Sequence, residues 1–95
     1  GVTIRWLIGK DSPAPNFLMR HFTIAPGGHT PYHKHSWEHE VFILKGRGVV
    51  RMEDGERALQ PYDTVFVAPN EMHNFRNAGD EPFEMLCLIP RPEEG

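Results

Sequence analysis

The sequence predicts a single all-β domain, folded as an antiparallel β-sandwich or barrel. Its 95 residues leave room for one hydrophobic core. Nine glycines and nine prolines divide the chain into short segments, and turn residues recur about every 8–12 positions between strand-like stretches. No stretch keeps apolar residues at helical spacing without meeting a proline or glycine, so a helical bundle is excluded.

Each expected strand lies between turn residues. In chain order the expected strands cover residues 2–8, 16–25, 40–45, 48–53, 57–60, 64–68, 73–77 and 83–89. The second ends at Pro26-Gly27-Gly28, and the last ends at Pro90. Between the fourth and fifth, Asp54-Gly55 predicts a hairpin whose two central residues both take positive φ. Turns rich in proline, glycine and asparagine separate the remaining strands.

Charge and composition exclude several classes of partner. The net charge is −3 and the basic residues are scattered, whereas nucleic-acid binding needs a basic patch. The longest apolar run, residues 85–89, is far shorter than the roughly 20 residues of a membrane helix. The lone Cys87 forms no internal disulfide, and no signal-peptide pattern opens the chain. We therefore expect a cytoplasmic protein with no nucleic-acid or membrane partner.

Histidines are concentrated in one segment. Four of the six, His29, His33, His35 and His39, fall within eleven residues. Side chains alternate along a strand, so the last three share one face if the segment stays extended. Imidazole is the commonest protein ligand for transition metals, and His73, at the start of a distant strand, offers a fourth. His21 and His29 are expected to be ordinary solvated residues.

These residues resemble the two sequence motifs of the cupin family, which are small antiparallel β-barrels of jelly-roll type. Gly28, His33, His35 and Gly46 match the first motif, at residues 28–46. Pro69, His73 and Asn77 match the second, at residues 62–77. The resemblance implies one cupin domain over residues 1–95 with a jelly-roll fold. It also makes residues 2–8 a possible dimer-swapped strand.

The chain departs from the usual motif at its acidic ligand, because His39 stands where cupins usually carry a carboxylate. Glu38 and Glu40 flank it on the opposite face and would bind only after a register slip or bulge. We therefore predict a four-histidine metal site. Its members are His33, His35, His39 and His73. A subgroup of small cupins resembles this chain in two segments, His-x-His-x-Trp-Glu-His-Glu and Pro-Asn-Glu-x-His. The alternative to the metal site is a degenerate cupin that binds no metal.

The second motif also lacks its usual glycines. Tyr62 and Glu71 stand at positions where glycine is common. We expect the loops at these positions not to require positive φ.

Four neutral imidazoles leave a divalent metal its full charge and favour an anionic or enolisable ligand. Imidazole suits Zn, Ni, Cu and Fe, and the resemblance implies Mn or Fe. If Glu84 points outward, alternation turns Met85 and Cys87 inward, and Phe75 shares the face of His73. These three residues are expected to line an apolar substrate pocket, with ordinary core packing as the alternative. Which side chains of residues 17–24 point inward is ambiguous, since the adjacent Arg20 and His21 are both polar.

The leading functional hypothesis is a metal-dependent, oxygenase-type enzyme acting on a small anionic, enolisable or aromatic substrate. One alternative is a non-catalytic, metal-dependent module that binds or senses a small molecule. Another is a sugar-type isomerase, with His73 or Glu40 as the base. A homodimer is also expected, because Ile4, Trp6 and Ile8 share one face of residues 2–8, and cupins commonly pair through such strands.

Overall fold

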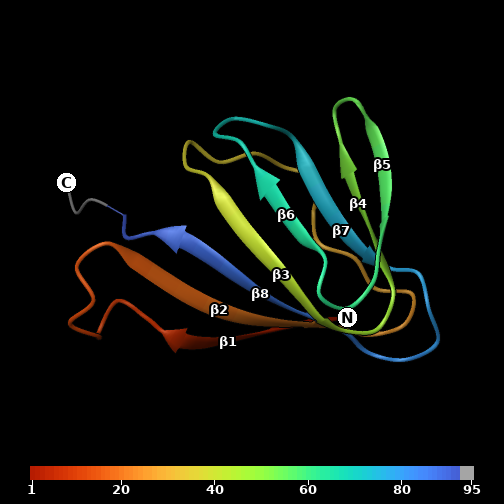
Figure 1. Ribbon diagram of the computed structural model, residues 1–95, viewed down its shortest axis with the longest axis horizontal. Coiled ribbons are helices and arrows are strands. Elements are labelled where there is room, and N and C mark those ends of the chain that lie inside the picture. Colours follow the sequence, from red (N-terminus) through yellow and green to blue (C-terminus); the bar gives the residue numbers. More distant parts are fainter. Residues whose placement is uncertain (93–95) are drawn as a thin grey trace.

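Eight strands form two antiparallel sheets in the computed structural model, which describes residues 1–92. The strands are β1 (Val2–Ile8), β2 (Phe17–Ile24), β3 (His39–Lys45), β4 (Gly48–Met52), β5 (Gly55–Leu59), β6 (Thr64–Val67), β7 (His73–Asn77) and β8 (Phe83–Pro90). The larger sheet has the order β1-β2-β8-β3-β6, and the smaller has the order β5-β4-β7 (Figure 1). The predicted all-β antiparallel fold is confirmed. No helix capable of crossing a membrane occurs in residues 1–92.

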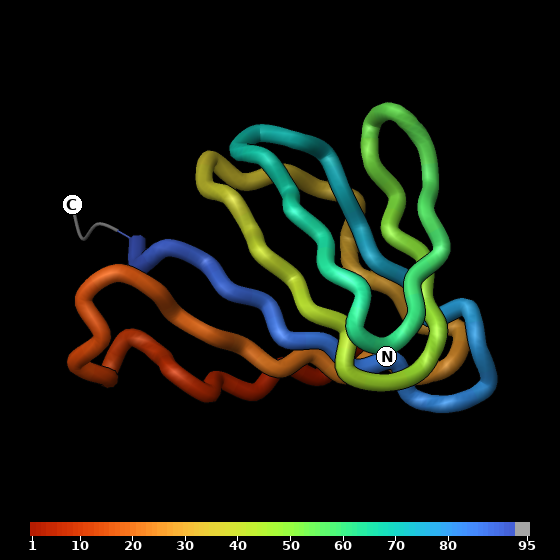
Figure 2. The backbone as a smooth tube through the Cα atoms, viewed as in Figure 1, coloured from red at the N-terminus to blue at the C-terminus, as the bar shows by residue number. Residues whose placement is uncertain are grey.

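The hydrophobic core comes from the inward faces of the two sheets. Figures 1 and 2 show β1 and β2 at one end of the molecule and β4 and β5 at the other. Along β8, buried and half-buried residues alternate over the whole strand, as expected for one face packed inward. The largest fully buried side chains are Phe83, Leu18, Ile24, Ile43, Met85, Val50 and Val67.

The hairpin between β4 and β5 differs from the prediction by one residue. Met52 pairs with Gly55, so the two turn residues are Glu53 and Asp54 rather than Asp54 and Gly55. Of these three positions only Gly55 has a positive φ, 136°. The glycine therefore follows the turn and takes the backbone conformation that a Cβ atom would disfavour.

The expectation for the Tyr62 loop is wrong. Tyr62 has a φ of 74°, a left-handed conformation that costs a non-glycine residue roughly 1–2 kcal/mol. The neighbouring loop takes its positive φ at Asn70, at 66°, and not at Glu71. Asparagine tolerates this conformation because its short side chain bonds to the local backbone.

Gly46 of the first motif has a structural reason to be glycine. Its φ is 86°, and a Cβ atom there would lie 2.4 Å from the carbonyl oxygen of Pro82. The turn from β3 to β4 therefore passes against the segment that enters β8. A side chain at position 46 would therefore force these two segments apart.

Strand β1 forms an exposed edge. It pairs with β2 along most of its length, and its other edge has no strand partner among the described residues. Ile4, Trp6, Leu7 and Ile8 remain exposed on it. This is the largest run of exposed apolar residues along any one strand described.

Candidate metal site

Three histidines converge where the loop before β3 meets the start of β7. The ligating nitrogens of His33, His35 and His73 all lie within 4.8 Å of one another. Two backbone hydrogen bonds join His33 to His73, with N–O distances of 3.1 and 2.9 Å. The His35 carbonyl accepts a third, from the amide of Asn70, at 2.6 Å. These backbone hydrogen bonds help to place the three rings together.

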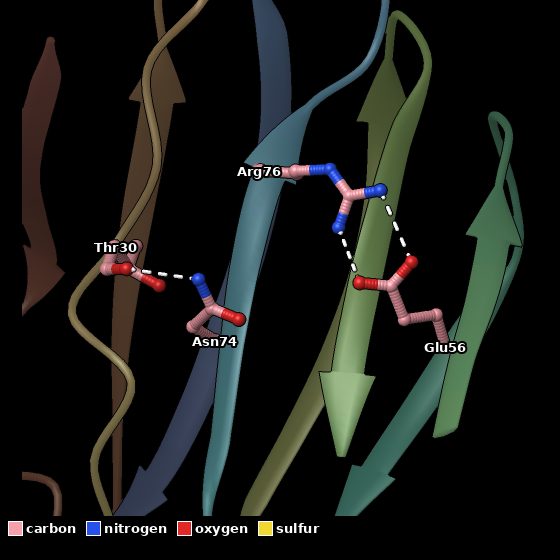
Figure 3. A network of polar contacts seen from close by, with 4 residues as sticks. All are labelled: Thr30, Glu56, Asn74 and Arg76. Atoms are coloured by element: carbon pink, nitrogen blue, oxygen red, sulfur yellow. Dashed lines mark hydrogen bonds and ion pairs between the residues drawn. The ribbon is translucent and has the colours of Figure 1, made fainter.

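Further contacts fasten the same loop along β7. The Asn74 side-chain amide donates to the Thr30 carbonyl at 3.1 Å (Figure 3). The Phe75 amide donates to the Thr30 hydroxyl at 2.9 Å. On the other side of β7, Arg76 makes a two-pronged ion pair with Glu56 of β5, at 2.7 and 3.1 Å (Figure 3). The strand that carries His73 is therefore held from both sides.

His39 is the fourth predicted ligand, and it lies beside the other three. Its ring centroid is 5.1 Å from those of His35 and His73. It does not belong to the group whose nitrogens all fall within 4.8 Å. Its Nε2 atom is buried and has no hydrogen-bond partner among the described residues. Such an atom is costly to leave unsatisfied, and a metal ion bound among the rings would satisfy it.

Contacts outside the cluster orient the rings. The Nδ1 atom of His73 lies 2.9 Å from the Glu71 carbonyl. Because a carbonyl only accepts, Nδ1 carries the proton and Nε2 keeps its lone pair free. His39 Nδ1 lies 3.3 Å from the Cys87 sulfur, and the Trp37 ring stacks on His35 at 4.8 Å, nearly parallel. Metal-binding histidines in proteins are oriented by contacts of this kind.

The backbone of this segment is not the continuous strand that the alternation argument assumed. The chain bends at Ser36 and Trp37, and β3 begins only at His39. His33 and His35 lie in the irregular loop, where His33 makes an isolated bridge to His73. The rings converge through this bend and bridge rather than through strand periodicity.

The electrostatics of the cluster favour the neutral form of His33, His35 and His39. Burial, reinforced by the neighbouring histidines and Arg20, lowers the pKa of His33 and of His35. The same causes, with burial the largest, lower the pKa of His39 to about 3. A neutral imidazole is the form that ligates a metal. His39 is therefore in its ligating form well below neutral pH.

The two glutamates that flank His39 interact with each other. A hydrogen bond that protonated Glu40 donates to the Glu38 carboxylate, followed by burial, raises the pKa of Glu40 to about 7. Glu40 lies in a separate outer groove, beside Phe42, Phe66 and Leu88. Neither glutamate lines the cavity that contains the histidines.

A cavity of about 320 Å³ opens beside the four histidines. Its lining comprises Val2, Ile4, Arg20, Phe22, Thr30, Pro31, His33, His35, His39, Val41, His73, Phe75, Met85 and Cys87. All three predicted pocket residues, Phe75, Met85 and Cys87, are among them. No carboxylate, lysine or tyrosine of residues 1–92 lines this cavity. It is thus an apolar chamber with its polar groups concentrated at the histidines and Arg20.

The residue that the sequence reasoning missed is Arg20. It lies on the inward face of β2, while His21 lies on the outward face and contacts Glu84 at 2.9 Å. The available signal was the apolar character of Leu18, Phe22 and Ile24, which share the parity of Arg20 and are buried. His29 lies outside the cavity lining and contacts the Thr30 carbonyl.

Comparison with known proteins places this geometry in a family. Residues 20–89 match the Cupin_2 family, described as a cupin domain. The 1-methylthio-D-xylulose 5-phosphate methylsulfurylase of Rhodospirillum rubrum is 38% identical over 71 residues, which cover 75% of this chain and 46% of that protein. The tetracenomycin polyketide synthase protein TcmJ of Streptomyces glaucescens is 30% identical over 100 residues, covering 100% and 67%.

Among solved structures, the polyketide cyclase RemF from Streptomyces resistomycificus superposes with a TM-score of 0.86 at 30% identity. The match covers 94% of this chain and 64% of that one. The chain thus spans about half to two thirds of the length of these relatives. From the family match, the two-sheet fold and the likeness to TcmJ across these 95 residues, we conclude that the chain belongs to the cupin family.

Proposed function

We propose that this chain is a metal-dependent enzyme acting on a small organic substrate, with the metal held by His33, His35, His39 and His73. The observation that carries the proposal is the buried, unpartnered Nε2 atom of His39 beside three converging imidazoles. A cluster built only for packing would leave that nitrogen uncompensated. A fourth ligand position accounts for it.

The donor set favours a transition metal. Four neutral imidazoles suit Fe, Zn, Ni and Cu by affinity, and we propose Mn or Fe in the cell from the family resemblance. When bound, the metal would supply a Lewis acid and, if it is Mn or Fe, a redox centre. The protein's part is to keep His39 neutral through burial and to orient the imidazoles through the contacts to Glu71, Cys87 and Trp37.

The cavity lining favours Lewis-acid chemistry on an enolisable substrate. Apart from the histidines, the lining offers no carboxylate, lysine or tyrosine within residues 1–92 that could shuttle protons. This disfavours the sugar-type isomerase, as do the walls, which are largely apolar. Two similar proteins are named as a polyketide cyclase and a polyketide synthase protein. Polyketide substrates carry enolisable carbonyl groups on an apolar framework, which is the chemistry this cavity fits.

Oxygenase-type chemistry is the second candidate. The observation that favours it is the same lack of a proton-transferring side chain, combined with a ligand set that suits iron. An oxygenase would consume dioxygen with the substrate, whereas a cyclase or a binding module would not.

A single probe separates these possibilities. Benzoylacetone is an enolisable diketone with an aromatic body, and its enolate absorbs in the near ultraviolet. With metal-loaded protein we expect the enolate band to grow as the released proton passes to the buffer, with little growth for the His73→Ala variant. An oxygen electrode run in parallel would show uptake only for an oxygenase. Enolate formation with neither turnover nor oxygen uptake would point to the binding module. If fully metal-loaded protein shows neither growth of the enolate band nor oxygen uptake, the proposal is contradicted.

We also propose that two copies of the chain associate through β1. Ile4, Trp6, Leu7 and Ile8 are exposed along this edge, and a second copy would cover apolar surface that a small domain otherwise leaves in water. Multi-angle light scattering should give twice the chain mass. A monomer at micromolar concentration would remove this part of the proposal.

A further inference from the structure

Arg20 is the one cationic side chain in the wall of the histidine cavity, among the described residues. It stands in a row that crosses the larger sheet, where Trp6 pairs with Arg20, Arg20 with Cys87, and Cys87 with Val41. The other members of this row are apolar or weakly polar. Arg20 is half-buried in these surroundings, and no other member of the row carries a charge that would balance its guanidinium.

The contacts of Arg20 hold the guanidinium in place without neutralising it. Its Cζ atom lies 4.8 Å from the Phe22 ring centroid and 5.6 Å from that of Trp6. Its Nη2 atom is 3.2 Å from the Cys87 sulfur, which is a weak acceptor. The Nε atom is buried and has no hydrogen-bond partner within residues 1–92. Neither ion pair found within residues 1–92 involves Arg20.

An anion inside the cavity would complete this arrangement. Arginine presents a planar set of donors that matches the two oxygens of a carboxylate, and stacking on Phe22 and Trp6 fixes the plane of that set. Arg20 and all four histidines line the same cavity of about 320 Å³. A ligand held by Arg20 therefore has its remaining atoms among the apolar walls and beside the imidazoles.

We propose that Arg20 is the residue that selects the substrate, by binding a carboxylate on a small molecule whose body is apolar or aromatic. This deepens the proposed function and rests on it for the identity of the ligand as a substrate. A carboxylate is favoured over a phosphate because the lining of the described chain provides one cation and no lysine to share a second negative charge.

The test compares a carboxylate with its neutral counterpart. Benzoate and benzamide have the same ring and nearly the same shape, and only benzoate is charged. Their affinities would be measured by isothermal titration calorimetry for wild-type protein and for Arg20→Gln. Each protein would be used both metal-loaded and after treatment with a chelator, with metal content determined by elemental analysis and folding by circular dichroism.

Arg51→Gln is the matched control. It removes the same charge from β4, where Arg51 lies 4.1 Å over the Tyr32 ring and outside the cavity lining. We expect benzoate to bind wild type and Arg51→Gln equally, and Arg20→Gln about tenfold to a hundredfold more weakly. Arg20→Lys should recover part of the loss, because it restores the charge without the planar donors. Benzamide should bind more weakly than benzoate to wild type and should not distinguish the variants.

Two results would overturn the inference. One is equal benzoate affinity for folded Arg20→Gln and wild type, which would show that the metal or the walls hold the anion. The other is failure of metal-loaded wild type to prefer benzoate over benzamide. Failure of the proposed function looks different: elemental analysis would find no bound metal, while the Arg20-dependent preference for benzoate would persist in the chelator-treated protein.

Discussion

His39 should make the chelator-treated protein lose stability as the solution becomes acidic. Burial, with repulsion from neighbouring histidines and Arg20, lowers the pKa of His39 from 6.5 to about 3. In the unfolded chain the same imidazole takes up a proton near its ordinary pKa. Between these two values the unfolded state binds more protons than the folded state, so the free energy of unfolding falls as pH falls.

The size of this effect follows from the pKa difference. One pKa unit corresponds to about 1.4 kcal/mol. Going from about pH 6.5 to about pH 4.5 should therefore remove about 2 kcal/mol of the stability that the neutral form of His39 provides. The lowered pKa values of His33 and His35 act in the same direction. Glu40 acts in the opposite direction, because its pKa is raised to about 7 and protonation favours its folded form.

A comparison of variants isolates His39 from these other groups. Urea unfolding in the presence of chelator would be followed by circular dichroism at several pH values, for wild type and His39→Gln. The difference between their free energies of unfolding should change by about 2 kcal/mol over about pH 6.5 to 4.5, in favour of the variant at low pH. Repeating the pair in a Glu40→Gln background removes the opposing group. A difference that stays constant with pH would refute the burial argument.

Three further changes test the fold and the cavity. Gly46→Ala should lower the free energy of unfolding by more than about 2 kcal/mol. The new Cβ would lie 2.4 Å from the Pro82 carbonyl oxygen, at a backbone φ of 86°. A urea midpoint close to that of wild type would show that this turn is misplaced. Asn77→Ala should lower the free energy of unfolding by about 2 kcal/mol, since the buried amide donates to the carbonyls of Ile24 and Glu81 at 2.9 and 2.7 Å. An unchanged melting temperature would contradict the importance of these hydrogen bonds. Cys87→Leu should alter the response to benzoylacetone while metal content stays near wild type, and iodoacetamide should label native Cys87 slowly because the residue is 4% exposed. Rapid labelling would place the thiol at the surface, and metal loss in Cys87→Ala would show that the thiol supports metal binding, as a ligand or through its contact with His39 Nδ1.

The strands were predictable because their signals are local. A proline or glycine lies within two residues of the end of most strands, although β8 includes Pro90. The boundaries of β1 and β7 agree with the prediction at both ends. The alternation along β8 also follows once Glu84 is assumed to point outward, because Met85 and Cys87 then point inward, as the structure shows. These features depend on a few adjacent residues, and a sequence displays them directly.

The errors arose where distant contacts decide the conformation. Tyr62 takes a positive φ although its side chain gives no sign of it, and its amide bonds to the Ile43 carbonyl of another strand at 2.8 Å. The loop carrying His33 and His35 is shaped by its bonds to β7 rather than by strand periodicity. Arg20 was unassigned because two adjacent polar residues obscured which face of β2 points inward. In each case the deciding partner is far away in the chain.

The most direct test of the four-histidine site is metal content after loading and desalting. Wild-type protein and the His39→Ala, His35→Ala and Glu40→Ala variants would be loaded with Mn(II), Fe(II) or Zn(II) and analysed for bound metal per chain. Wild type and Glu40→Ala should retain one metal ion per chain, while His35→Ala and His39→Ala should lose most of theirs. Full occupancy in His39→Ala together with loss in Glu40→Ala would contradict the assignment and make a glutamate the fourth ligand.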